Sequence, residues 1–316
     1  MSITAEIRAE VREVMRNVVR QAVPIRWRSG ERFGAGERKS KQRGKGDDYD
    51  GIVEFSPGDD VRNIDWQTYI MTDGEELNVH TYRETTDIKS FVLIDVSTTM
   101  NFGTNRVTKR RLAAELGASC VASLNETKDR VGMMAYSAKG LERYIKPSIA
   151  SIRSMFLTAA TALASSEGKG SGNGLTKALK RLPSSRSLVF IISDFMNMTN
   201  EDWAALRRVA RYHDVVAMFV QDVRERELPD VSWGWGPLGW LTGTIGCFYT
   251  LEDFTGARRT IWVNKKTRAQ YAANFRAHEA AIVAKLQESR CRSVIVSTEE
   301  GDHAFPKLVK TFGRAR

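Results

Sequence analysis

One loop of the sequence carries three oxygen-bearing side chains in close succession. The apolar run FVLI at residues 91–94 ends in Asp95, and hydroxyl side chains follow at alternate positions as Ser97 and Thr99. Alternate spacing lets the two hydroxyls face one point while the side chains between them turn away. Because no histidine or cysteine is close by in the sequence, these hard oxygen donors suit Mg²⁺, Mn²⁺ or Ca²⁺ rather than zinc. The loop therefore predicts a divalent-cation site.

A second apolar run ends in a similar way. SLVFIISD at residues 187–194 delivers Ser193 and Asp194. Ligands of open α/β sheets bind at the carboxyl ends of strands, where the strand order reverses, so we expect Asp194 to join the first loop in one site. The simpler alternative is that the loop of Asp95 only caps a following helix and that Asp194 is a turn residue at a strand end.

Hydrophobic patterning predicts the elements that must position these two loops. Apolar strands are expected at residues 89–96, 130–137, 187–195, 214–222 and 293–298, and helices at 107–127, 148–165, 200–212 and 268–289. Strands this apolar are buried on both faces, which requires a parallel sheet with helices on each side. The sequence therefore predicts a doubly wound, mostly parallel α/β domain over residues 89–316.

The N-terminal region has a different character. Residues 1–25 predict an amphipathic helix. Its apolar face contains Ile7, Val11, Val14 and Val18, and its basic face contains Arg8, Arg12, Arg16 and Arg20. The arginine stripe is either a solvated face or a contact for an acidic partner. The basic, glycine-rich composition of residues 26–46 predicts a loop. Residues 47–88 predict a β-rich element with a hairpin turn at Asp73-Gly74, between strands at 65–71 and 76–82.

Composition and charge limit the classes of function. The 316 residues carry a net charge of +10, and residues 1–46 alone hold 12 Lys and Arg against 5 Asp and Glu. Flexible cations suffice for phosphate contacts, so nucleic-acid binding through residues 26–46 is one alternative, although aromatic side chains for base stacking are few there. Three scattered cysteines fit a reducing compartment, and we expect a cytoplasmic location without an N-terminal signal segment.

The two strand-end loops together resemble a known kind of metal site. Asp95-x-Ser97-x-Thr99, followed by a strand that ends in Asp194, resembles the metal-ion-dependent adhesion site of von Willebrand factor A domains. Upstream, PGDDVRNIDW at residues 57–66 resembles the DUF58 family of bacterial von Willebrand A-like proteins, and this resemblance runs from about residue 30 to the C-terminus. It implies a divalent cation, Mg²⁺ or else Mn²⁺ or Ca²⁺, held by Asp95, Ser97, Thr99 and Asp194.

The resemblance also implies partners and a fifth ligand. Genes of that family commonly accompany a MoxR-type AAA+ ATPase, which implies this ATPase and a client protein as partners in maturation, assembly or metal insertion. Thr99 stands where serine is commoner and keeps the hydroxyl. The family's later threonine ligand falls at Asn173 in the stretch SGNGLTKAL, with Ser171 or Thr176 as alternatives.

Residues 232–246, SWGWGPLGWLTGTIG, look like an insertion relative to that family. They contain Trp233, Trp235 and Trp240, and tryptophan is favoured at interface anchors. The insertion is therefore either a partner-binding loop or a hairpin folded onto its own domain. The uncharged stretch 231–251 approaches membrane-spanning length, but its five glycines and one proline argue against a transmembrane helix. Peripheral membrane contact is left open.

These features favour a non-enzymatic protein-binding module. The sequence has no G-x-x-x-x-G-K-[ST] loop, no G-x-G-x-x-G after the first apolar strand and no G-x-S-x-G frame around Ser171, and its four histidines are scattered. We expect a cation at the Asp95 loop to bind a carboxylate of the ATPase or of its client. The alternatives are a metal-dependent hydrolase that uses the same carboxylates and the nucleic-acid binder described above.

Overall fold

The computed structural model describes residues 5–21, 48–57, 59–83, 89–104, 107–126, 129–164, 173–228, 247–252 and 258–300. The chain divides into two compact units, one made of Met1–Trp27 with Ile88–Arg316 and the other of Arg28–Asp87. Within the described ranges, no helix is long and apolar enough to cross a lipid bilayer.

The larger unit is built on a six-stranded sheet with the order β10-β7-β6-β3-β4-β5. The strands are β3 (Lys89–Asp95), β4 (Arg130–Ser137), β5 (Gly140–Ile149), β6 (Ser187–Ser193), β7 (Asp214–Gln221) and β10 (Arg292–Ser297). All neighbours are parallel except β5, which is antiparallel to β4. The predicted mostly parallel sheet is confirmed.

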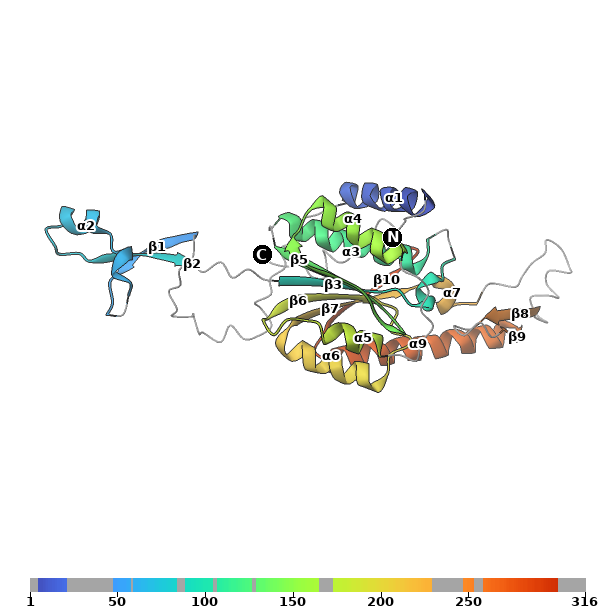
Figure 1. Ribbon diagram of the computed structural model, residues 1–316. Coiled ribbons are helices and arrows are strands. Elements are labelled where there is room, and N and C mark those ends of the chain that lie inside the picture. Colours follow the sequence, from blue (N-terminus) through green and yellow to red (C-terminus); the bar gives the residue numbers. More distant parts are fainter. Residues whose placement is uncertain are drawn as a thin grey trace. The chain divides into compact units, whose positions relative to one another are not determined.

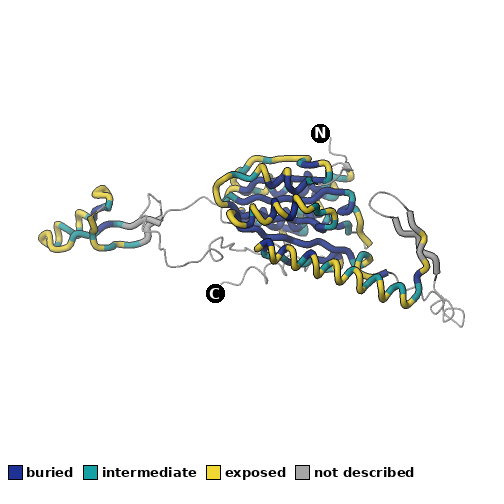
Figure 2. The backbone as a smooth tube through the Cα atoms, turned by 90° about the horizontal axis from the view of Figure 1, so that it is seen from below, coloured by how far each residue is buried: buried dark blue, intermediate teal, exposed yellow. Residues whose placement is uncertain are grey.

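Helices cover both faces of this sheet (Figure 1). One face carries α1 (Ala5–Gln21), α3 (Lys109–Glu126) and α4 (Ile152–Ala164), and the other carries α5 (Gly174–Leu179), α6 (Asn200–Tyr212) and α9 (Lys265–Glu288). Alternate side chains of β3 pack on opposite faces of the sheet. Val92 and Ile94 belong to one apolar cluster, and Phe91 and Leu93 belong to the other. β3, β4, β6 and β7 are accordingly buried along most of their length, while α1, α6 and α9 keep an exposed face (Figure 2). The doubly wound α/β prediction is confirmed.

The register of the sheet brings two strand ends together. β3 lies between β4 and β6, so the strand order reverses at β3. Ile94 on β3 is opposite Ile192 on β6 in a parallel pair, which places Asp95 beside Ser193. The short helices η2 (Thr98–Asn101) and α7 (Val223–Arg226) follow β3 and β7, and a separate antiparallel pair is formed by β8 (Cys247–Glu252) and β9 (Arg258–Val263).

One predicted helix begins later than expected. The sequence pattern predicts a helix from residue 148, but β5 extends to Ile149 and α4 begins at Ile152. The chain reverses directly after β4, with Ser137 opposite Gly140, and β5 pairs along β4. Pro147 interrupts the apolar pattern of β5, yet it is tolerated because β5 is the edge strand.

The smaller unit contains a helix where a strand was predicted. β1 (Asp48–Glu54) pairs with β2 (Asn78–Arg83), and between them lie η1 (Val61–Asn63) and α2 (Trp66–Met71). The hairpin expected at Asp73-Gly74 is therefore wrong. Asp65 starts α2, because its carboxylate accepts the N–H of Thr68 at 3.2 Å and the Thr68 hydroxyl at 2.7 Å. The positive φ angles of Asp73 and Gly74, 48° and 85°, end that helix instead of joining two strands.

Candidate functional site

Asp95 is a buried carboxylate at the carboxyl end of β3. Its side chain accepts the backbone N–H of Ser97 at 2.9 Å and the hydroxyl of Ser193 at 2.7 Å. Burial raises the pKa of Asp95 to about 6, and the nearby charge of Asp194 adds to this effect. A buried carboxylate with a raised pKa is one whose charged form a cation would stabilise.

The hydroxyls of Ser97 and Thr99 face each other, as expected from their alternate spacing. Their oxygens are 2.9 Å apart, and both residues are buried. Ser97 occupies the N-cap position of η2, but its side chain makes no capping hydrogen bond. Helix capping therefore does not account for the Ser97 hydroxyl.

A small cavity lies beside this loop, with a volume of about 30 Å³. That is room for an ion or a few water molecules. Of the predicted ligands, Asp95, Ser97 and Asn173 line it. Ser193 and Asp202 line it as well. Neither is among the ligands predicted from the sequence.

The backbone at Asn173 and Gly174 forms one wall of the cavity. Asn173 has φ 67°, a left-handed conformation that Asn tolerates better than most residues. Its amide is already engaged, since Nδ2 donates to Glu201 and Oδ1 accepts from Thr199, both at 2.8 Å. A Cβ on Gly174 would lie 1.8 Å from the carbonyl oxygen of Ser137, so α5 and the turn after β4 are in direct backbone contact.

Asp202 joins α5 to the start of α6 beside the cavity. Its Oδ1 accepts the N–H of Thr176 at 2.8 Å and the Thr176 hydroxyl at 2.7 Å, while Oδ2 accepts the Thr199 hydroxyl at 2.8 Å. Thr199 and Asp202 form a capping box at the start of α6. The Thr-x-x-Asp spacing before an amphipathic helix was a sequence signal for this role.

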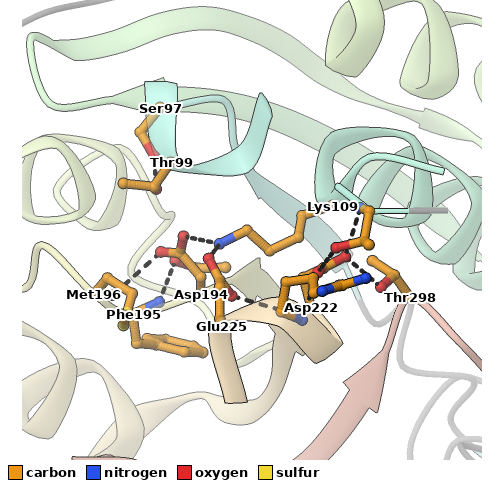
Figure 3. A network of polar contacts seen from close by, with 12 residues as sticks. Ser97, Thr99, Lys109, Asp194, Phe195, Met196, Asp222, Glu225 and Thr298 are labelled. Carbon is orange, nitrogen blue, oxygen red and sulfur yellow. Dashed lines mark hydrogen bonds and ion pairs between the residues drawn. The ribbon is translucent and has the colours of Figure 1, made fainter. Parts of the chain in front are cut away.

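Asp194 faces the buried side chain of Lys109 (Figure 3). It is not among the described residues that line the cavity. The ammonium nitrogen of Lys109 lies 2.8 Å from Asp194 and 2.6 Å from Glu225, and the Lys109 side chain has no solvent exposure. Burial alone would lower the pKa of Lys109, but the two carboxylates outweigh it and raise that pKa. The structure therefore gives Asp194 an internal cation as its partner.

Asp222, at the carboxyl end of β7, is the third buried strand-end aspartate (Figure 3). It accepts hydrogen bonds from the side chain and backbone of Thr104, the latter at 3.1 Å, and from the Thr298 hydroxyl at 2.7 Å. Burial would raise its pKa, yet these hydrogen bonds lower it. Asp222 links the loop after η2 to the end of β10. Its place after an apolar strand was the same signal that identified Asp95.

The donor set fits a divalent cation in part. Asp95 supplies a buried carboxylate, Ser97 and Thr99 supply two adjacent hydroxyls, and the cavity beside them is large enough for one ion. Asn173 and Asp194 have their polar atoms engaged elsewhere. Among the described residues, no group of three or more His, Cys, Asp or Glu is arranged to hold a metal, so such a site would depend on the hydroxyls.

The PGDDVRNIDW motif belongs to the smaller unit, and several other predicted residues lie outside the described ranges. The aspartates of PGDDVRNIDW cap local turns, since Asp59 accepts the N–H of Ser56 and Asp60 that of Arg62. Trp66 at the end of that motif is 54% exposed, so it is not packed into a core within its unit. The structure does not describe Ser171, Trp233, Trp235, Trp240 or residues 26–46.

A family comparison connects this geometry to known sequences. The model of a family described as "Protein of unknown function DUF58" matches residues 52–281. The chain belongs to the DUF58 family. The matched range includes the Asp95 loop, Lys109, Asp194 and Asp202. The candidate site therefore lies within the region that this DUF58 protein shares with its family.

Individual relatives are more distant. The DUF58 protein is 30% identical over 181 residues to an uncharacterized protein, Rv1480, of Mycobacterium tuberculosis, and equally to one of Mycobacterium bovis, covering 56% of each chain. It thus spans about half the length of these relatives. Among solved structures, the conserved hypothetical protein BatB of Bacteroides thetaiotaomicron is 14% identical with a TM-score of 0.39, over 71% of this chain and 98% of that one. A von Willebrand factor type A protein of Catenulispora acidiphila is 16% identical with a TM-score of 0.31, over 64% and 43%.

Proposed function

We propose that this DUF58 protein is a non-enzymatic protein-binding module of the cytoplasm that holds a divalent cation, Mg²⁺ or else Mn²⁺ or Ca²⁺, at the loop of Asp95, Ser97 and Thr99. The cation supplies an open coordination position at which a partner carboxylate binds. The partner is a MoxR-type AAA+ ATPase or the client that this ATPase matures, assembles or loads with metal. The partnership rests on the family resemblance carried by PGDDVRNIDW and the Asp95 loop.

The observation that carries the proposal is that Asp95 and Ser97 line a small cavity and that the Thr99 hydroxyl lies 2.9 Å from that of Ser97. Asp95 is held in place from two sides by the Ser97 N–H and the Ser193 hydroxyl. Both bonds orient the carboxylate without neutralising it, so its charge is available to a cation. The small volume of about 30 Å³ favours an ion over an organic substrate.

Each residue of the site has a defined task in this proposal. Asp95 provides charge, and Ser97 and Thr99 provide neutral oxygens, which leave the cation electrophilic toward a further carboxylate. Burial of all three residues excludes water and strengthens the electrostatic attraction. Lys109 offsets one of the two negative charges of Asp194 and Glu225. This reduces the repulsion that the pair exerts on an incoming acidic group.

A thermal-shift titration tests the cation site. A ligand that binds only the folded state at a hundredfold excess over its Kd adds about 2.7 kcal/mol to the free energy of unfolding, so Mg²⁺ or Mn²⁺ should raise Tm. Asp95→Asn should abolish this shift. Asp222→Asn is the matched control, because it changes a strand-end aspartate that does not line the described cavity; it should lower Tm yet keep the metal response. Equal metal responses in wild type and Asp95→Asn contradict the site.

The partner interaction is tested by a pull-down of the MoxR-type ATPase with and without EDTA. Wild-type protein should lose binding in EDTA. Ser97→Ala should bind weakly in both conditions, because it lacks a ligand hydroxyl and has little left for the chelator to remove. Full-strength binding of wild-type protein in excess EDTA overturns the metal bridge, even if the titration shows that metal binds.

A further inference from the structure

A basic groove lies beside the candidate cation site. It has a volume of about 580 Å³ and is lined by residues 139–142, at the β4–β5 turn, and by Lys177, Lys180 and Arg181, in and just after α5. The groove adjoins the cavity along two segments of the chain. Ser137 lines the cavity and Lys139 the groove, and likewise Leu175 lines the cavity and Lys177 the groove. The contact between Gly174 and the Ser137 carbonyl fixes these two segments together.

The groove contains four exposed cationic side chains and one carboxylate. Within the described part of the chain, Lys139, Lys177, Lys180 and Arg181 form no ion pair with a carboxylate. Lys177 lies across the turn and donates to the carbonyl of Lys139 at 2.9 Å, and a Cβ on Gly140 would lie 2.8 Å from its Cδ. The one carboxylate, Glu142, accepts the Ser137 hydroxyl at 2.5 Å. Among the described residues, the groove therefore offers positive charge that no carboxylate neutralises.

We propose that this groove binds an acidic segment of the protein partner, and that the segment runs from the groove to the Asp95 cavity, where one of its carboxylates is held. This inference rests on the proposed function and names the chemistry of its partner. The four cations attract successive Asp or Glu side chains, which speeds association of an acidic segment with the groove.

The surroundings favour an acidic peptide over a nucleic acid. Phosphate chains are usually bound by longer basic tracts with aromatic side chains for stacking, and the groove residues named above include no aromatic side chain. The adjoining cavity is acidic, since Asp95 and Asp202 line it. That cavity repels a segment's carboxylate unless a cation is bound, so occupancy of the metal site and of the groove should be coupled.

The test is fluorescence anisotropy of a labelled short poly-glutamate peptide, with poly-glutamine and single-stranded DNA as comparison probes, in Mg²⁺ and in EDTA. The groove variant is Lys180→Gln with Arg181→Gln, and a second variant reverses both charges to Glu. The matched control is Arg153→Gln, an exposed arginine on α4 at the opposite face of the sheet. Circular dichroism and the Mg²⁺ thermal shift are recorded for every variant.

We expect the groove charge reversal to weaken poly-glutamate binding about tenfold, since two exposed charge interactions at most are lost and then inverted. Arg153→Gln should bind as wild type does, and poly-glutamine should bind weakly to all. If the groove variants bind poly-glutamate as tightly as wild type does, the groove proposal is overturned. A Mg²⁺-induced rise in Tm in the same variants would still support the cation site. If poly-glutamate binding is weaker in the groove variants but equal in Mg²⁺ and in EDTA, the groove is supported and the metal bridge is overturned. DNA bound more tightly than poly-glutamate, and lost in the groove variants, overturns the proposal in favour of nucleic acid.

Discussion

At the scale of single residues, Lys109 is a buried cation between two carboxylates. Its ammonium nitrogen is 2.8 Å from Asp194 and 2.6 Å from Glu225, and the side chains are 0%, 2% and 14% exposed. Lys109→Met leaves both carboxylates without a counter-charge, so we expect the free energy of unfolding to fall by about 3–5 kcal/mol. Urea denaturation measures this loss.

A matched variant separates charge from packing at this position. Lys109→Met combined with Asp194→Asn and Glu225→Gln removes all three charges at nearly constant volume. It should recover much of the lost stability, because replacing a complete buried ionic group by neutral residues is often close to neutral. If Lys109→Met alone is as stable as wild type, the buried ion group described here is not a stabilising feature.

The sequence predicted the loop of Asp95, Ser97 and Thr99 because all three residues fall in one contiguous stretch. It could not predict which of Ser193 and Asp194 faces that loop, since adjacent strand residues point to opposite sides. The structure turns Ser193 toward Asp95 and Asp194 toward Lys109. Lys109 itself had no signal, because it opens a run of three basic residues and only its tertiary contacts distinguish it from its half-buried neighbours.

At the scale of elements, the contact between α5 and the β4–β5 turn shapes the cavity. The Cβ of Gly174→Ala would lie 1.8 Å from the Ser137 carbonyl oxygen, a backbone atom that cannot rotate away. We expect this variant to lose about 1–3 kcal/mol in urea denaturation. Gly117→Ala on α3 is the comparison. There the nearest atom is the Cδ1 of Ile94 at 2.8 Å, a side-chain end that can move, and Ala gains about 1 kcal/mol of helix propensity over Gly. A smaller loss for Gly174→Ala than for Gly117→Ala would contradict this account.

The junction between α6 and β7 predicts sensitivity to acid. His213 caps the end of α6, is 7% exposed, and its Nδ1 has no hydrogen-bond partner among the described residues. Burial lowers its pKa, so the folded state binds fewer protons than the unfolded state. The resulting stability is complete above the ordinary pKa of about 6.5 and is lost as the pH falls through that value toward the lower folded pKa.

The measurement compares unfolding free energies at about pH 7.5 and about pH 5.5, which bracket the ordinary pKa of histidine. Wild-type protein should lose more stability than His213→Gln between these conditions, because the variant has no proton to take up at this position. Equal losses in the two proteins would show that His213 makes no contribution to acid sensitivity.

Elements with strong patterns were predictable, and those whose conformation depends on neighbours were not. The buried strands β3, β6 and β7 have continuous apolar runs, so their type and burial follow from the sequence. β5 alternates between half-buried and exposed residues at the sheet edge, which leaves a weaker pattern. α2 was mistaken for a strand because its helical character comes from the Asp65 cap and not from an apolar stripe, and none of its residues is buried.

At the scale of the whole molecule, α1 is part of the core and not an appendage. Val11, Val14 and Val18 are at most 1% exposed and belong to the same apolar cluster as residues of α3 and α4. Val14→Ala should lower the free energy of unfolding by about 1–3 kcal/mol. Arg12→Gln, on the exposed face of the same helix, should leave it nearly unchanged. Urea denaturation of both variants checks this, and equal effects would mean that the valine face is not packed in solution.

The place of α1 in the core has a consequence for the order in which the chain is made. Asn17 on α1 and Glu115 on α3, which are hydrogen-bonded in the folded protein, are 98 residues apart. At about 5–20 residues per second, the valine face of α1 leaves the ribosome some seconds before α3 exists to cover it. During that interval we expect the exposed valine face to be open to chaperones that recognise apolar segments of nascent chains. α1 therefore reaches its final packing only after α3 and α4, which follow it in the chain, have also been made.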